Sequence, residues 1–499
     1  MIKHSTILIL FAIFLSACQP RTIQTVAPTG TPQPATPTST PTAVPIPTQT
    51  PLPSITAPAF TSTPETPTQP ITGIHINHLT SPDEMSLFTQ AGAYWTRFDG
   101  FHWDLIEPVD ETKPVYQWKK VNEAALKAAA NAGAQVIAIV NYAPDWAQKY
   151  PGVACGPFAE AALDKFGAFM YALVSRYSQP PYNVKYWEIG NEPDIDHTLI
   201  GPHSPFGCWG DQSDPYYGGG YYARMLKAAY GQVKQADPQS QVLIGGLLLD
   251  CDPNNPPETS KNSGKYKDCS PSRFLEGILK NGGGDYFDGV SFHAYDYFPT
   301  QLGQYVNPNW HSSWDTTGPV LTTKATFIHD LLAANGHSDK FLIDTEFALL
   351  CGKDGTEAKC QTEEFNLTKA YYIAEGNAAA VAHGLLGNVW YSLTGWRASG
   401  LVDKSLKPNL AYDAEKFSAA QLKDAAFVAD VTAFPGVKGY EFHQKDGKKL
   451  WLLWSQDGDS HSIQLTSLPT GIFDAFGKAL PTEKNLTISV APVYLEWEP

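Results

Sequence analysis

The sequence predicts an α/β fold, a (β/α)8 TIM barrel followed by a small C-terminal all-β domain. From residue 71 onward, short apolar runs alternate with helical patterns, which is typical of repeated βα units and a parallel sheet. Eight such units in about 360 residues match the length of one barrel. After about Phe434 the pattern changes to short alternating runs separated by Asp-Gly and Pro-Thr-Gly turns. We therefore expect the barrel over residues 71–430 and a β-sandwich-like domain over residues 431–499.

The barrel strands are expected where the apolar runs lie, at residues 71–76, 94–98, 135–140, 184–189, 241–247, 287–292, 340–345 and 386–391. Helices are expected between them, and these candidates break at Gly, Pro or Asn: residues 122–132, 158–177, 221–235, 323–334 and 367–383. A doubly wound sheet is the alternative. It is disfavoured because no Gly-rich phosphate turn follows the first strand, where Gly73 stands nearly alone.

The N-terminus predicts export. Lys3 and His4 precede an apolar run over residues 7–14, which is too short to anchor a chain across a bilayer. The run ends in Leu15-Ser16-Ala17-Cys18, which resembles the lipobox of bacterial lipoproteins. We expect residues 1–18 to be a signal peptide with Cys18 as the acylated residue; an ordinary signal peptide with a chance cysteine is the alternative.

Residues 19–70 predict a disordered linker. The segment is dominated by Pro and Thr, and Arg21 and Glu65 are its only charged residues. Because it contains scarcely a bulky apolar side chain, it cannot bury a core. The expected location is therefore extracytoplasmic, with the folded part held away from the membrane on a lipid-anchored stalk.

Composition favours a neutral partner. The 499 residues include 35 Lys and Arg against 50 Asp and Glu, a formal charge of −15, without a long basic run. Such a chain has little with which to bind nucleic acid or anionic lipid, so the membrane contact expected is the lipid anchor alone. Aromatic residues make up 12% of the chain, which suits stacking against sugar rings but also suits an aromatic-rich core. We expect a carbohydrate partner and a monomer.

Two apolar runs on opposite sides of the predicted barrel lead to glutamates. Glu192 follows the fourth run and Glu346 follows the seventh. Active sites of such barrels lie at the C-terminal ends of the strands, so both carboxylates can project into one cleft. Paired carboxylates are what glycosidic cleavage requires, one as proton donor and one as nucleophile or base.

The segment Trp187-Glu188-Ile189-Gly190-Asn191-Glu192-Pro193 resembles the acid/base motif of the clan A retaining glycoside hydrolases. The resemblance covers residues 71–430, and within the clan this segment is most similar to families 39, 5 and 42. It implies that Glu192 is the acid/base, that Glu346 is the nucleophile and that Asn191 binds the sugar 2-hydroxyl. It implies no metal or organic cofactor.

Further positions match the clan. The resemblance implies that Arg97 lies near the nucleophile, and that His293, Tyr295 and Trp390 line the sugar subsite, with Trp390 as its floor. Four aromatic residues in loops at the same face are expected either to touch sugar or to wall the cleft: Trp103, Tyr142, Trp146 and Trp396. Glu188 is expected to be a buried structural carboxylate paired with Arg97 or His75, and Asp344 to turn away from Glu346 as a supporting acceptor.

The two catalytic carboxylates are expected to differ in charge. At about 5.3 Å and an effective dielectric of about 20, two ionised carboxylates repel by roughly 3 kcal/mol. Arg97 favours ionisation of Glu346, so Glu192 is expected to hold the proton at neutral pH.

Six cysteines remain when Cys18 is set aside, and they fall into neighbouring couples: Cys155 with Cys208, Cys251 with Cys269, and Cys351 with Cys360. Six cysteines allow about 15 connectivities, and this one is the most economical. Disulfides persist outside the cytoplasm, and bonds in these loops would stiffen the cleft rim.

Two other function classes compete with the hydrolase. One is a non-catalytic carbohydrate-binding lipoprotein, against which the retention of both Glu192 and Glu346 argues. The other is a metal-dependent barrel hydrolase, for which histidines are available at His75, His78, His102 and His293, but without the spacing of a known zinc motif. In the β domain, Trp451, Trp454 and Trp497 are expected to pack the sheet rather than bind sugar.

Overall fold

A computed structural model of the chain describes residues 70–201, 204, 206–256, 269–299, 310–316 and 318–499. The chain divides into two compact units, residues 1–63 and 64–499, and the described residues all belong to the second. The expected signal peptide, Cys18 and almost all of the linker lie outside the described residues. Among the helices that are described, none has both the length and the apolar character needed to cross a bilayer.

Eight parallel strands close into a barrel, as the sequence predicts. They are β1 (Thr72–Ile74), β2 (Trp95–His102), β3 (Gln135–Asn141), β4 (Tyr186–Asn191), β5 (Gln241–Leu247), β6 (Gly289–Phe298), β8 (Phe341–Cys351) and β9 (Asn388–Trp390). The sheet runs β5-β4-β3-β2-β1-β9-β8-β6, and the pairing of β5 with β6 closes the ring. A short strand β7 (His311–Ser312) adds antiparallel to β6.

Alternate residues of these strands fill the barrel interior. Its lower part is closed by a buried apolar cluster that includes Trp95, Ile137, Leu243, Ile343 and Val389. Positions further along the same strands are polar, and they form the site described below. The barrel is therefore a packed core, with the polar groups of the candidate site toward the carboxyl ends of its strands.

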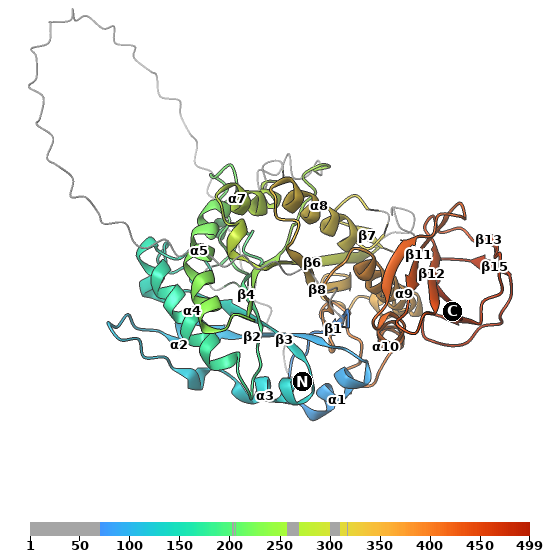
Figure 1. Cartoon of the computed structure of the whole chain (residues 1–499), viewed down its shortest axis with the longest axis horizontal. Helices are drawn as coiled ribbons and strands as arrows, with labels where there is room; N and C mark the ends of the chain where they lie inside the picture. Colours follow the sequence, from blue (N-terminus) through green and yellow to red (C-terminus); the bar gives the residue numbers. More distant parts are fainter. Residues whose placement is uncertain (1–69, 202–203, 205, 257–268, 300–309, 317) are drawn as a thin grey trace, which may run out of the picture. The chain divides into compact units, whose positions relative to one another are not determined.

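Helices surround the barrel (Figure 1). They are α1 (Pro82–Gln90), α2 (Trp103–Ile106), α3 (Glu123–Asn131), α4 (Leu163–Tyr177), α5 (Gly219–Ala236), α7 (Phe274–Lys280), α8 (Leu321–Ala334), α9 (Glu363–Ala382) and α10 (Leu410–Leu422). Several begin at a side-chain cap, for example Asn122 before α3 and Thr362 before α9. The five expected helices are present with ends shifted by up to five residues, and α1, α2, α7 and α10 are additional to them.

The C-terminal region forms antiparallel sheets, as expected. Five strands pair in the order β10 (Ala426–Asp430), β11 (Val437–His443), β12 (Lys449–Ser455), β16 (Val493–Trp497) and β14 (Gly471–Asp474), and β13 (His461–Gln464) pairs with β15 (Asn485–Ile488). The first of these strands begins at Ala426, ahead of the boundary expected at 431, because β10 pairs with β11 rather than with the barrel.

The larger sheet packs on the barrel helices α9 and α10. The ring of Phe417 on α10 lies 5.7 Å from that of Phe473 and 5.1 Å from that of Tyr494, measured between centroids. In Figure 1 the orange strands β11 and β12 lie beside α9. Of the three tryptophans considered above, Trp454 is buried in the cluster shared with the barrel helices. Trp497, also buried, and the half-buried Trp451 pack against each other in the separate core of the C-terminal sheets.

Candidate active site

The two glutamates come from opposite sides of the barrel, and both of their side chains lie close to His293. Glu192 follows β4 directly, in a left-handed backbone conformation with φ of 51°, and its N–H donates to the carbonyl of Gly246 at 2.9 Å. Non-glycine residues in this conformation are uncommon and often mark functional positions. Glu346 lies within β8, which extends past the expected end at 345 to Cys351 because it stays paired with an equally extended β6.

A β-bulge sets the direction of Glu346. Phe292 of β6 pairs with Asp344, but the next residue, His293, pairs with Glu346, so Thr345 is the extra residue. Thr345 Oγ1 donates to Glu188 inside the barrel at 3.0 Å. In a regular strand Glu346 would then face outward; the bulge turns it inward as well. Asp344, expected as a supporting acceptor, accepts a hydrogen bond from the Glu346 N–H at 3.3 Å.

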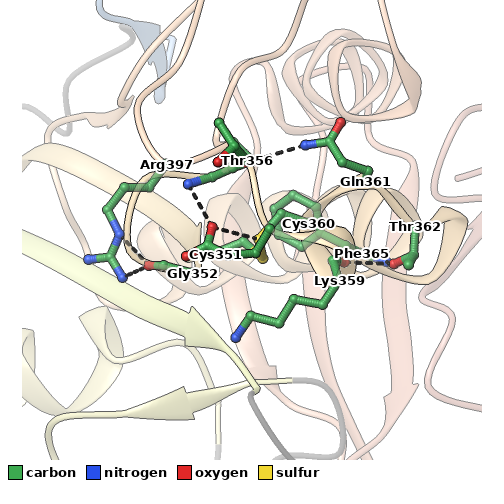
Figure 2. The surroundings of a disulfide bond; sticks show 12 residues. Cys351, Gly352, Thr356, Lys359, Cys360, Gln361, Thr362, Phe365 and Arg397 are labelled. Atoms are coloured by element: carbon green, nitrogen blue, oxygen red, sulfur yellow. Dashed lines mark hydrogen bonds between the residues drawn. A yellow bond between two sulfur atoms is a disulfide. The ribbon is translucent and has the colours of Figure 1, made fainter. Parts of the chain in front are cut away.

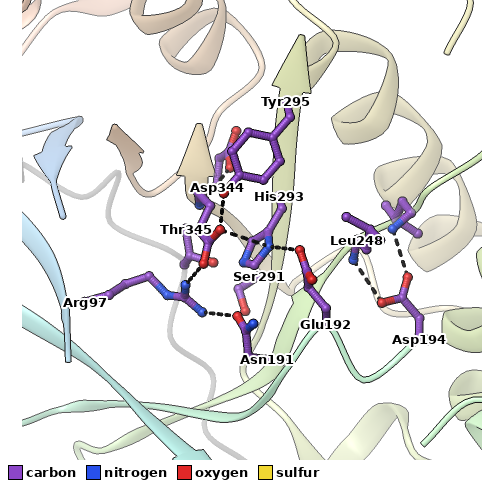
Figure 3. Close-up of polar contacts among 12 residues, drawn as sticks. Arg97, Asn191, Glu192, Asp194, Leu248, Ser291, His293, Tyr295, Asp344 and Thr345 are labelled. Carbon is purple, nitrogen blue, oxygen red and sulfur yellow. Dashed lines mark hydrogen bonds and ion pairs between the residues drawn. The ribbon is translucent and has the colours of Figure 1, made fainter. Parts of the chain in front are cut away.

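Arg97, buried on β2, connects the polar side chains that surround the two glutamates (Figure 3). Its Nη1 donates to Glu346, and its Nη2 donates to Asn191 Oδ1 at 2.9 Å and to Glu188 Oε2 at 2.7 Å. Glu188 also accepts from Ser291 Oγ at 2.6 Å. Glu188 is thus the buried structural carboxylate that the sequence predicts, and Arg97 lies where the resemblance implies.

His293 and Tyr295, on β6, contact the two glutamates. The hydroxyl of Tyr295 donates to Glu346 Oε2. Nδ1 of His293 lies 2.8 Å from Glu192 Oε1 and 3.6 Å from Glu346 Oε2. His293 fits against β5 because Gly246 has no side chain: a Cβ there would lie 2.1 Å from His293 Nε2. One ligand atom from each of Glu192, His293 and Glu346 lies within 4.8 Å of the others.

The two glutamates have different electrostatic surroundings. Burial, the negative charge of Glu346 and that of Asp194 hold the pKa of Glu192 well above its usual 4.5. Burial also raises the pKa of Glu346, but the positive charge of Arg97 and the Tyr295 hydrogen bond oppose that rise. Glu192 therefore keeps its proton to higher pH than Glu346. Burial and the charges of Arg97 and Lys324 hold the pKa of His293 well below 6.5, so its imidazole is neutral.

A buried lysine on α8 supports this arrangement, and the sequence analysis did not identify it. Lys324 Nζ donates to the carbonyls of His293 at 2.8 Å and of Leu248 at 2.7 Å. Asp194, two residues after Glu192, accepts from the backbone N–H groups of Leu248 and Leu249 at 2.9 and 2.8 Å. Lys324 and Asp194 thus fix the ends of β5 and β6 beside Glu192.

Tyr391, not Trp390, faces the site. Trp390 is 1% exposed; its ring lies 5.6 Å from that of Phe347, and its Nε1 donates to the carbonyl of Ser399 at 2.9 Å. The expectation that Trp390 floors the sugar subsite is therefore wrong, because Val389 points into the barrel and Trp390 points out toward α9. The half-buried ring of Tyr391 lies 4.9 Å from His75 and 6.3 Å from Tyr295. The sequence analysis did not identify Tyr391, because Trp390 next to it matched the tryptophan position of the clan.

The loop aromatics divide into two groups. Trp103 is 0% exposed, packed against Trp146 and the α4 phenylalanines, so the expectation that it touches sugar is also wrong. Trp146 is half-buried on Trp103, and its Nε1 donates to the Glu107 carbonyl at 3.2 Å. These contacts hold it in the loop wall, the second of its two expected roles. Tyr142 is half-buried with its ring 4.8 Å from His102, whereas Trp396 is 50% exposed beside Tyr295.

A cavity of about 420 Å³ opens beside Arg97. It lies between the loops that follow β1 and β2, and its polar lining includes His75, Asn77, Asp99 and His102. The cavity is of a size usual for small-ligand sites, is rich in hydrogen-bonding groups and adjoins Glu346 through Arg97.

The three cysteine couples are bonded as expected, Cys155 with Cys208, Cys251 with Cys269, and Cys351 with Cys360. The first bond ties the loop after β3 to the loop after β4. The third closes a loop of nine residues directly after β8 (Figure 2). All three lie beyond the carboxyl ends of barrel strands, and so surround the face that carries the glutamates.

Glu192, His293 and Glu346 also form the group of described side chains whose spacing could hold a metal ion. The guanidinium of Arg97 already donates to Glu346, and its permanent positive charge opposes a second cation there. His75, His78 and His102 are not part of this group. The group is therefore a pair of carboxylates with a neutral imidazole beside both of them.

No protein-family model and no curated protein matches the sequence. Solved structures of similar fold do exist. A family 39 glycoside hydrolase from the gut symbiont Bacteroides cellulosilyticus is 17% identical, with a TM-score of 0.61 over 86% of this chain and 81% of that chain. The catalytic domain of GH30 xylanase C from Talaromyces cellulolyticus is 14% identical (TM-score 0.57, 86% and 98% covered), and a monomeric β-xylosidase from Caulobacter crescentus is 15% identical (TM-score 0.54, 86% and 96% covered). At these identities the likeness shows the fold.

Proposed function

We propose that this chain is a retaining glycoside hydrolase that cleaves β-glycosidic bonds of a poly- or oligosaccharide by double displacement. The observation that carries the proposal is the spacing of Glu192 and Glu346, whose facing oxygens lie within 4.8 Å. An inverting enzyme holds a water between its carboxyl groups and separates them by about 6.5 to 9.5 Å, whereas a retaining enzyme separates them by about 5 to 5.5 Å. One oxygen of each carboxylate lies within 4.8 Å of the other, a shortest approach that favours the closer spacing of the retaining enzymes.

Glu346 is suited to act as the nucleophile. Arg97 and the Tyr295 hydroxyl each donate to one of its oxygens, and both interactions favour the ionised form. Glu346 attacks the anomeric carbon, the bond from that carbon to the leaving oxygen breaks, and a glycosyl ester forms.

Glu192 is suited to act as acid and then as base. Its raised pKa keeps the proton that the leaving oxygen needs, and its buried Oε2 has no hydrogen-bond partner among the described residues. Once Glu346 is esterified its negative charge is lost, so the repulsion that holds the Glu192 proton falls. Glu192 can then accept a proton from the water that hydrolyses the ester, and it regains its starting state.

Kinetics of two variants on an aryl β-glycoside test these roles. Glu346→Ala should hydrolyse no substrate, because it cannot form the covalent intermediate. Glu192→Ala should still be glycosylated when the leaving group is activated, stall before deglycosylation, and recover turnover with azide, giving a β-glycosyl azide. A 2-fluoro glycoside should label Glu346 in the unmodified chain. A label on Glu192, or an α-glycosyl azide, would show that the two roles are assigned wrongly.

The same assay distinguishes the competing function classes. A non-catalytic carbohydrate-binding protein would bind a glycan in affinity electrophoresis and release no reducing ends from it. A metal-dependent hydrolase would lose its activity in EDTA and recover it with a divalent cation. The double-displacement proposal requires activity that is unchanged by the chelator.

We also propose that the protein is exported and anchored by lipid at Cys18, with residues 19–70 as the linker to the folded part. The support is the sequence pattern Leu15-Ser16-Ala17-Cys18, together with disulfides on the folded part. Palmitate labelling in a bacterial host tests it. Cys18→Ala should abolish labelling and release the protein from the membrane fraction.

A further inference from the structure

A second cavity, of about 480 Å³, lies between the extended ends of β6 and β8. We call it the cationic pocket, because its lining includes Lys353, Lys359 and Arg397, beside the rings of Tyr297 and His311. Lys353 and Lys359 lie on the loop closed by the Cys351–Cys360 bond, and Arg397 follows β9. Figure 2 shows Arg397 reaching this loop, where it donates to the Gly352 carbonyl, with Nε at 2.7 Å.

The positive charges of the cationic pocket are not neutralised by ion pairs. Within the described part of the chain, none of Lys353, Lys359 and Arg397 lies in a salt bridge with a carboxylate; Lys359 donates to the Pro299 carbonyl at 3.4 Å. Glu357 is the acidic residue of the lining, and its oxygens accept from the backbone N–H groups of Lys353 and Gly355. Three cations therefore face one carboxylate, in a chain whose formal charge is −15.

The cationic pocket lies next to the active site, and three aromatic rings lie between the two. Tyr295, which donates to Glu346, has its ring 6.1 Å from that of Trp396. The guanidinium of Arg397 lies over the rings of both Trp396 and Tyr297, at 5.4 Å from each centroid. The exposed face of Trp396 thus lies between the nucleophile and the positive charges, where a sugar ring can stack on it.

We propose that the cationic pocket binds an anionic substituent of the glycan, a uronic acid carboxylate or a sulfate ester, on a sugar unit near the cleaved bond. This inference rests on the proposed function and specifies its substrate class. Ammonium and guanidinium groups form their strongest hydrogen bonds with carboxylate and sulfate oxygens. Because the rest of this acidic chain repels a polyanion, a local group of unpaired cations selects where the charged unit binds.

The test compares charged polysaccharides with their neutral forms. Uronate-containing polymers are paired with carboxyl-reduced forms, and sulfated polymers with desulfated forms. Affinity electrophoresis measures binding to the Glu346→Ala chain, which cannot turn the ligand over. At least one charged polymer should bind about tenfold more tightly than its neutral form, with a preference that weakens as salt rises. The member of the panel that shows this preference distinguishes carboxylate from sulfate.

The double variant Lys353→Ala/Lys359→Ala, made in the Glu346→Ala chain, should lose this preference while keeping its affinity for the neutral form. Lys423→Ala/Lys445→Ala removes two exposed lysines of the C-terminal region and should keep the preference. Equal binding of charged and neutral forms throughout the panel, or a preference that survives the loss of Lys353 and Lys359, would overturn the inference. Hydrolysis by the unmodified chain is measured separately. Cleavage of neutral glycans without a preference for charged ones would support the proposed function and contradict the role of the cationic pocket. A binding preference for charged polymers without hydrolysis would support the cationic pocket and contradict the proposed function.

Discussion

Nδ1 of His293 lies 2.8 Å from Oε1 of Glu192, and both side chains are buried. Because the imidazole is neutral, it adds no charge that would strip the proton from the carboxyl group. A neutral imidazole can donate to an ionised carboxylate through Nδ1–H, or accept from a protonated one in its other tautomer. His293 can therefore hold Glu192 in position both before and after proton transfer.

Asp194 should control the alkaline limb of the pH profile. Its negative charge contributes to the raised pKa of Glu192, and Asp194 itself, with a pKa raised to about 6 by burial, is ionised above that pH. Asp194→Asn removes the charge, so the pKa of Glu192 falls and the acid loses its proton at lower pH. The alkaline limb of kcat/KM on an aryl β-glycoside should move to lower pH.

Lys324 provides the opposite control. Its positive charge lowers the pKa of Glu192, so Lys324→Met should move the alkaline limb to higher pH. A merely structural role for either residue would reduce activity at every pH alike. Shifts of the two variants in the same direction would contradict this account of Glu192.

Substitution of Tyr391 should reduce substrate binding, whereas substitution of Trp390 should reduce stability. Tyr391→Ala removes a ring beside His75 and Tyr295, so kcat/KM should fall by about tenfold or more with little change in unfolding free energy. Trp390→Ala empties a buried space and should cost about 3 to 5 kcal/mol of stability. Kinetics and urea denaturation of the two variants check this. The reverse pattern would return Trp390 to the sugar subsite.

Stability should fall toward alkaline pH because of a buried glutamate on α10, Glu415, which accepts a hydrogen bond from Asn377 on α9. Burial raises the pKa of Glu415 from its usual 4.5 to about 8. The unfolded chain releases this proton near pH 4.5, and the folded chain holds it to about pH 8. The free energy of unfolding is therefore highest below pH 4.5 with respect to this group, and it falls as the pH rises from 4.5 to 8.

Glu415→Gln should remove this loss, and its amide oxygen can still accept from Asn377, which donates to Glu415 at 2.8 Å in the native chain. The difference in unfolding free energy between variant and native chain should change by up to roughly 5 kcal/mol between pH 4.5 and 9, in favour of the variant. Urea denaturation at several pH values measures it. Glu364→Gln, on the exposed start of α9, should show no such trend.

The disulfides should contribute unequally to stability. Cys155–Cys208 closes 53 residues and Cys351–Cys360 closes nine. From loop-closure entropy the first is worth about 4 kcal/mol and the second about 2.5 kcal/mol. Replacing each pair by Ser should therefore lower the unfolding free energy more for the longer loop. An equal loss would indicate that local packing, not chain entropy, sets the contribution.

The barrel and its two glutamates could be predicted because strand order alone carries them to one face. Glu192 and Glu346 follow the fourth and seventh apolar runs, and any barrel with those strands brings them together. The choice between Trp390 and Tyr391 is different in kind. Adjacent strand residues point to opposite faces, so an error of one position reverses the assignment. Val389, which fills the barrel interior, fixes that register, but the sequence does not distinguish it from the apolar residues around it.

Lys324 and the bulge at Thr345 could not be predicted from pattern. Lysine on a helix is ordinarily exposed, and only the packing of α8 against β6 buries Lys324. The bulge depends on how β8 pairs with β6, which no run of residues within β8 reveals. Trp103 failed as a sugar ligand for a related reason: a loop aromatic is buried or exposed according to its neighbours, here the phenylalanines of α4.

The packing of the C-terminal sheet on α9 and α10 limits how the protein can be shortened. Phe417 and the buried Glu375 and Glu415 lie on these helices, and a chain ending near residue 425 would leave the face toward the sheet in water. Such a truncated barrel should aggregate during recombinant expression even though it keeps every active-site residue. Residues 426–499 thus shield an apolar face of the barrel helices from water. Crystallisation or engineering of the protein should therefore start from the whole of residues 70–499.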